Sequence, residues 1–167
     1  MSNPVPIRLE QVRLPGELDR SQLVRRIDAN RLQVEPSSRW AAPLEGMTRR
    51  VLSANLALRL PAGTVADPYQ AAPDARPLGV DIQELYGNSQ CDVSLSATWV
   101  LSAETHGMRA ARGMQPGAEG GTEEVHVAAA PGSPCPEILA ATMSQAFGVL
   151  ADRMAAAIVG VRATEGR

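Results

Sequence analysis

The sequence predicts an α+β protein, a two-layer sandwich in which two long helices pack on one face of a mostly antiparallel sheet. Apolar and polar residues alternate through residues 93–101, which is the two-residue period of a half-buried strand. Apolar residues recur at helical spacing in residues 44–60 and 137–161. The chain has 167 residues, of which 44% are hydrophobic. We therefore expect a single domain over residues 1–167, with an ordered core of about residues 5–160.

The first predicted element is a small hairpin. Two short extended runs, residues 23–27 and 32–35, flank Asp28, Ala29 and Asn30. These three side chains favour a tight turn, so the two runs should pair as antiparallel strands.

The first helix is expected to begin at Pro43 and to end before Pro61 and Gly63. Its main buried stripe is predicted at Leu44, Met47, Val51, Ala54 and Leu58, widened on one flank by Leu52, Leu56 and Leu60. Asn55 falls beside Val51 and Leu58, where an unpaired amide would cost about 1 to 3 kcal/mol. Asn55 either forms a fixed hydrogen bond that holds a neighbouring loop, or lies at the edge of the stripe and reaches water.

After this helix the sequence predicts a loop over residues 61–77 and a strand over 78–83, followed by a turn at Gly87, Asn88 and Ser89. The strand over 93–101 contains Trp99, for which we expect a structural role. A further strand should include Met108 and Ala110, and one more should cover residues 125–129 after a glycine-rich loop at 113–121. The second long helix begins near residues 133–136, with Glu137 in its first turn.

Composition and motifs argue against nucleic-acid binding and against catalysis. All 16 basic residues are arginine, the net charge is −2, and only five aromatic residues are present, so a nucleic-acid partner is not expected. The arginine pairs at 25–26 and 49–50 are interpreted as solvated faces. His106 and His126 lie on separate predicted strands without neighbouring ligands at metal-binding spacing. We expect no metal, no cofactor and no enzyme activity.

Cys91 and Cys135 are too far apart in the sequence for a CxxC redox motif. In an oxidising periplasm they could form a disulfide that closes a loop of about 45 residues and contributes ~4 kcal/mol. The alternative is that the strand tip and the helix start do not meet.

The order of motifs in residues 14–61 resembles that of the ABC-type transport auxiliary lipoprotein component family, the group that includes proteins of the paraquat-inducible protein C type. The resemblance covers roughly residues 5–160 and implies a first strand before Leu14. The matching residues are Leu14, Pro15, Leu18, Asp19, Arg20, Leu32, Trp40, Pro43, Leu44, Asn55, Leu56 and Pro61.

The resemblance implies a non-enzymatic periplasmic lipoprotein of a lipid transport system, anchored to the outer membrane by an N-terminal lipid. Its implied partner is a tunnel protein with mammalian-cell-entry (MCE) domains, and a ring of identical copies is a further option. Proteins of this family are made with a signal peptide and a lipidated cysteine. We therefore expect Met1 to stand in place of a removed export segment.

Arg39, Trp40 and Tyr69 are the candidate partner-binding residues, because they flank the first helix and because arginine and aromatic side chains are favoured at interface centres. Trp40 could instead close the end of the core. An alternative function is a periplasmic carrier that binds a lipid or another amphiphile between the helices and the sheet. That function would need a cavity in the two-layer core.

Overall fold

The computed structural model describes residues 5–103, 105, 118–132, 134–135 and 137–165, with side chains as far as residue 160. The described residues form one six-stranded sheet, two α-helices and a short 3-10 helix. In chain order the elements are β1 (Ile7–Arg13), η1 (Gly16–Leu18), β2 (Gln22–Asp28), β3 (Arg31–Arg39), α1 (Leu44–Arg59), β4 (Arg76–Gly87), β5 (Val93–Leu101), β6 (Glu119–Val127) and α3 (Glu137–Glu165).

The sheet has the order β3-β2-β4-β5-β6, and β1 also pairs with β4. The β2–β3, β4–β5 and β5–β6 pairs are antiparallel, whereas β1 and β2 run parallel to β4. Strand β1 occupies the first half of β4, and β2 meets β4 through the single pair Arg25 and Gly87. The sheet is therefore mixed but mostly antiparallel, as the sequence predicted.

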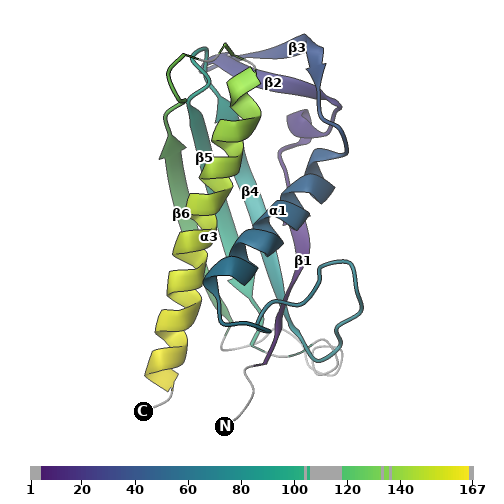
Figure 1. Ribbon diagram of the computed structural model, residues 1–167, viewed down its shortest axis with the longest axis vertical. Helices are drawn as coiled ribbons and strands as arrows, with labels where there is room; N and C mark the ends of the chain where they lie inside the picture. Colours follow the sequence, from purple (N-terminus) through teal and green to yellow (C-terminus); the bar gives the residue numbers. More distant parts are fainter. Residues whose placement is uncertain (1–4, 104, 106–117, 133, 136, 166–167) are drawn as a thin grey trace.

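Helices α1 and α3 lie side by side on one face of the sheet, so the two-layer prediction is confirmed (Figure 1). The core fills the space between the layers. It is formed by alternate residues of β4 and β5 and by the inward face of α3, where apolar side chains are almost fully buried; the largest of them include Leu78, Ile82, Leu85, Leu95, Trp99, Leu101, Leu139 and Leu150.

The two ends of the molecule are formed by different elements. The start of β1 and the C-terminal end of α3 lie at one end, and the β2–β3 hairpin lies at the opposite end (Figure 1). The hairpin has only the Arg25–Gly87 strand pairing to β4. It therefore projects from the main body of the sheet.

The buried face of α1 differs from the predicted one. Leu44, Leu52 and Leu56 are buried, whereas Ala54 is exposed and Leu58 is 83% exposed. The apolar arc of this helix is wider than the contact that the sheet and α3 offer, so Leu44 and the predicted flank of Leu52, Leu56 and Leu60 are buried, and the rest of the predicted stripe is not. Polar Thr48 and Ser53 share the buried surface, and counting apolar residues alone did not identify them.

Strand β6 begins at Glu119, well before the predicted start at residue 125. Gly120 and Gly121, which the sequence placed in a loop, pair with Val100 and Trp99 of β5. A Cβ atom at Gly121 would lie 3.1 Å from the Trp99 indole nitrogen. Gly121 therefore permits close packing against the Trp99 ring, and Gly120 permits a close approach to the Trp99 backbone carbonyl.

Several other element boundaries differ from the predicted ones. The predicted hairpin is present as β2 and β3, and the strand predicted at 78–83 is the longer β4. The strand predicted around Met108 and Ala110, together with His106, falls outside the described residues. The Val161 side chain, predicted in the α3 stripe, is also outside them.

Cys91 and Cys135 form a disulfide, with their Cα atoms 5.9 Å apart. The bridge joins the β4–β5 turn to the segment that precedes α3. Cys91 adopts a positive φ of 62°, and the turn is organised by Asn88, whose side-chain oxygen accepts the backbone N–H groups of Gln90 and Asp92. The turn predicted at Gly87, Asn88 and Ser89 is therefore present at this position.

Candidate partner-binding surface

Tyr69 lies in the loop between α1 and β4 and is fixed against the first turn of α1. Its phenol donates a hydrogen bond to the Gly46 carbonyl at 2.8 Å, although the residue is 56% exposed. Its backbone N–H donates to the Asp67 carboxylate at 2.8 Å. An exposed aromatic ring in a fixed orientation loses little conformational entropy when a partner covers it.

Arg49 of α1 extends the same surface. Its guanidinium carbon lies 5.6 Å from the centre of the Tyr69 ring, within the range of a cation–π contact. Arg49 also forms an ion pair with Glu45, one turn earlier, with an N–O distance of 2.5 Å. The sequence interpretation of residues 49–50 as a solvated face overlooked this contact, because Tyr69 is distant in the chain.

Arg39 and Trp40 lie where β3 leads into α1. Arg39 is the exposed last residue of β3 and faces Gln22 of β2. Trp40 is half-buried against the core, and its backbone N–H donates to the Ser21 carbonyl at 2.7 Å. The structure thus places Trp40 and Tyr69 on two segments that border the N-terminal end of α1, with Trp40 contributing to the core as well.

Asn55 acts inside α1 and toward α3 rather than toward a loop. Its amide nitrogen donates to the Val51 carbonyl at 2.9 Å, and its side-chain oxygen accepts a hydrogen bond from Arg59 at 2.9 Å. Arg59 in turn pairs with Asp152 of α3. Asn55 therefore orients the arginine that links the two helices.

Sequence reasoning missed a buried ion pair inside the hairpin. Arg25 of β2 and Glu35 of β3 are paired at 2.5 Å, and their side chains are only 13% and 11% exposed. The interpretation of Arg25 as part of a solvated face was wrong. Opposite charges at nearby positions of the two predicted strands were the available signal.

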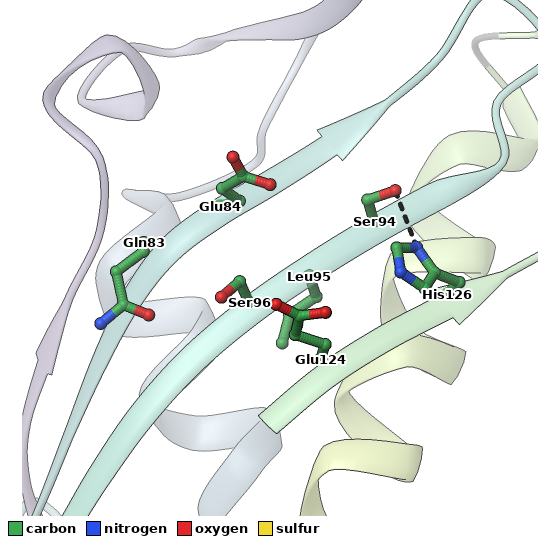
Figure 2. Close-up of a pocket in the computed structure, with 7 residues that line it drawn as sticks. All are labelled: Gln83, Glu84, Ser94, Leu95, Ser96, Glu124 and His126. Atoms are coloured by element: carbon green, nitrogen blue, oxygen red, sulfur yellow. Dashed lines mark hydrogen bonds between the residues drawn. The ribbon is translucent and has the colours of Figure 1, made fainter. Parts of the chain in front are cut away.

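The face of the sheet opposite the helices carries a shallow polar depression of about 240 Å³ (Figure 2). Polar side chains of β4, β5 and β6 point toward it, and Leu95 points to the other side of the sheet. His126 accepts or donates a hydrogen bond with the Ser94 hydroxyl at 3.0 Å. The lining residues are Gln83, Glu84, Ser94, Leu95, Ser96, Glu124 and His126.

This depression does not resemble a metal or catalytic centre in the part of the chain that the structure describes. No group of three or more histidine, cysteine or carboxylate side chains within the described ranges is arranged to hold a metal ion. Within the same ranges, no helix is long and apolar enough to cross a bilayer. The described surface also carries an aromatic and arginine patch beside α1 and a partly exposed hairpin.

A mixed sheet covered on one face by two helices defines a small two-layer α+β domain. Its family follows from sequence comparison. The family described as "ABC-type transport auxiliary lipoprotein component" matches residues 2–155, so the chain belongs to this family. The family is one of transport components rather than of enzymes.

Two curated relatives carry the name "Intermembrane transport lipoprotein PqiC", one from Escherichia coli (strain K12) and one from Shigella flexneri. Each is 32% identical over 95 residues, which cover 56% of this chain and 50% of the relative. The match thus spans about half the length of these relatives.

Two solved structures share the fold. The crystal structure of an uncharacterized protein has a TM-score of 0.73 and 20% identity, covering 93% of this chain and 96% of that one. The crystal structure of a protein from Xanthomonas campestris has a TM-score of 0.67 and 16% identity, covering 97% of this chain and 91% of that one. At these identities the likeness concerns the fold.

Proposed function

We propose that this protein is a non-enzymatic lipoprotein component of an ABC-type lipid transport system, which docks an MCE-domain tunnel protein at the outer membrane. The family match over residues 2–155 is the observation that carries this proposal. In the proposed arrangement the protein is periplasmic and is anchored by a lipid on an N-terminal cysteine in the precursor. Its role is to bind the partner, and this role needs no catalytic site.

The surface beside α1 is our candidate for the partner contact. Tyr69 is exposed yet held by Gly46, and Arg49 lies over its ring. Arg39, the exposed last residue of β3, precedes the start of α1 and is the second candidate. Aromatic and arginine side chains are enriched among residues whose truncation costs binding energy.

The test compares binding of the purified MCE-domain partner to wild-type protein and to Tyr69→Ala and Arg39→Ala variants. We expect each substitution to weaken binding by about tenfold or more, as is typical of residues at an interface centre. Leu58→Ala is the matched control. Leu58 is 83% exposed on α1, but it lies far along the helix from Gly46, which Tyr69 contacts. Unchanged binding by both variants would remove this surface from the proposal.

Trp40 requires a different substitution because it packs against the core. Trp40→Phe keeps an aromatic ring there, whereas Trp40→Ala would mix lost packing with lost binding. If Trp40 contacts the partner, Trp40→Phe should lower affinity with little change in thermal stability. A loss of stability without a loss of affinity would assign Trp40 to the core alone.

The alternative of an amphiphile carrier has a simple test. Large side chains fill the space between the layers, and the 240 Å³ depression lies on the opposite face of the sheet. Native mass spectrometry of protein purified from the periplasm should therefore reveal no bound phospholipid. The same measurement gives the number of subunits and so tests assembly into a ring of identical copies.

A further inference from the structure

The two edges of the sheet differ in how they are covered. Strand β6 forms one edge of the sheet, and β3 and β1 share the other, because β1 pairs with β4 alone among the named strands. At β6, Arg153 of α3 donates a hydrogen bond to the Glu124 backbone carbonyl and lies 3.8 Å from the Glu123 carboxylate. An edge strand offers unpaired backbone groups that can pair with another chain, and a side chain bonded to those groups blocks such pairing. The helix thus covers part of the β6 edge.

Strand β3 is exposed in a different way. Leu32 and Val34 are 42% and 38% exposed, and their spacing of two residues puts them on one face of the strand. Pro36 and the register irregularity that follows Val34 interrupt regular pairing. Pro36 and this irregularity limit any added strand to residues 31–35, which form a short and partly apolar edge.

The hairpin is held in place despite its single strand pair with β4. The Arg25 guanidinium donates to Glu35 at 2.5 Å, to the Ser89 carbonyl at 3.3 Å and to the Cys135 sulfur at 3.4 Å. It thereby connects β2 and β3 to the β4–β5 turn and to the disulfide. Burial of this ion pair makes the connection less sensitive to solvent than a surface pair would be.

The turn at the tip of the hairpin is organised by Asp28. The backbone N–H of Asn30 and then the Arg31 guanidinium hold the pKa of the Asp28 carboxyl below its ordinary value of 3.8. At neutral pH the carboxylate is therefore ionised and accepts both hydrogen bonds, at 3.0 and 2.5 Å. A strand fixed in this way is preorganised for an extended ligand.

The charge of the hairpin region differs in sign from that of the whole chain. Residues 19–39 hold five arginines and three carboxylates, whereas the net charge of the chain is −2. Arg25, Arg26 and Arg31 are paired with Glu35, Glu84 and Asp28. Among the described residues, Arg20 and Arg39 have no carboxylate partner, and both lie at the open end of the hairpin, where Gln22 pairs with Arg39. An acidic ligand would complement them.

We propose that residues 31–35 of β3 are a docking edge that accepts an extended, net-acidic segment of a partner protein as an added strand. Backbone hydrogen bonds to β3 would supply affinity, and apolar side chains of the segment would cover Leu32 and Val34. Carboxylates in the part of the segment that continues past residue 35 would face Arg39 and Arg20 at the open end of the hairpin. The identity of the partner as an MCE-domain protein rests on the proposed function, whereas the chemistry of the edge does not.

The test uses two probes so that the two proposals can fail separately. The first probe is a synthetic peptide of alternating valine and glutamate, with a valine and lysine peptide as its opposite-charge counterpart. The second is the purified MCE-domain partner. We expect the acidic peptide, and not the basic one, to slow amide hydrogen exchange at residues 31–35.

The double substitution Leu32→Glu/Val34→Glu adds two negative charges at exposed positions of β3, and these charges would repel an acidic segment. It should weaken binding of both probes by about tenfold or more. Leu58→Glu is the control, because it adds the same charge at an exposed leucine on α1 and should leave binding unchanged. Circular dichroism of all variants verifies that the fold is retained.

The outcomes separate the hypotheses. Peptide binding at β3 without binding of the MCE-domain protein would keep the docking edge and reject that partner. Binding of the MCE-domain protein that the double variant retains would overturn the docking edge and leave the proposed function standing. If no peptide binds, and the double variant loses binding to phosphatidylglycerol vesicles, the hairpin contacts a membrane surface and the docking-edge proposal is overturned. If the double variant loses only self-association, the hairpin contacts a second copy of the chain, and the docking-edge proposal is likewise overturned.

Discussion

At the scale of single residues, Trp99 shows how one side chain determines the local sequence around it. Its ring is 2% exposed and packs over Gly121 of β6. Within the described residues its indole N–H has no hydrogen-bond acceptor. The stability that Trp99 contributes should therefore come from packing alone.

Substitution of Trp99 tests this account. Trp99→Ala should lower the free energy of unfolding by about 3 to 5 kcal/mol, because it leaves a large cavity. Trp99→Phe should cost clearly less, since it keeps most of the packing and breaks no hydrogen bond. Urea denaturation of both variants measures the difference. Equal losses for the two substitutions would mean that the indole nitrogen has a partner.

Asn55 shows what sequence can and cannot give for one residue. The position of a polar amide on an apolar helix predicted that it needs partners. Those partners are Val51 in its own helix and Arg59, which pairs with Asp152. The pairing with α3 was not predictable, because the rotation of α1 on the sheet decides which neighbour Asn55 meets.

At the scale of elements, periodicity predicted the strands and helices better than their faces and ends. The alternation in residues 93–101 led directly to β5, whose buried and less buried positions alternate. The α1 stripe failed because its apolar arc is wide and tertiary contacts select one flank of it. The predicted start of β6 was wrong because glycines favour loops in a single sequence, whereas here Gly120 packs against the Trp99 backbone and Gly121 against its ring.

The disulfide is a connection between elements, and its removal should loosen the attachment of the hairpin. Cys91 and Cys135 are separated by 44 residues, and closing such a loop contributes about 4 kcal/mol in the chain-entropy description. A Cys91→Ala/Cys135→Ala variant should lose up to this amount in urea denaturation. It should also show faster amide exchange in β2 and β3, because Arg25 contacts Cys135.

Reduction of the wild-type protein with dithiothreitol is the matching control for this prediction. The reduced wild type and the double variant should have similar midpoints, and the double variant should not respond to the reductant. A midpoint that dithiothreitol leaves unchanged in the wild type would mean that the bridge contributes nothing to stability.

At the scale of the whole molecule, the placement of surfaces came only from the structure. The sequence indicated the sheet, the helices and the three candidate residues Arg39, Trp40 and Tyr69. It did not indicate that the hairpin projects at one end, because that depends on β1 and β2 sharing the length of β4. The parallel pairing of β1 connects distant segments, which local patterns do not encode.

Under the proposed function, this arrangement of the two ends predicts how the orientation of the protein on a membrane affects its binding to the partner. The start of β1 and the hairpin lie at opposite ends (Figure 1), and β4 alone, with 12 residues, extends over about 40 Å. A cysteine added before Met1 and coupled to a maleimide lipid should leave residues 31–35 facing away from the vesicle. Capture of the MCE-domain protein should then match capture by the untethered protein.

Coupling through Asn30→Cys at the hairpin tip should reduce capture by about tenfold or more, because the docking edge then faces the bilayer. The untethered Asn30→Cys protein controls for the substitution itself. Equal capture in both orientations would show that the hairpin end is not the surface that meets the partner.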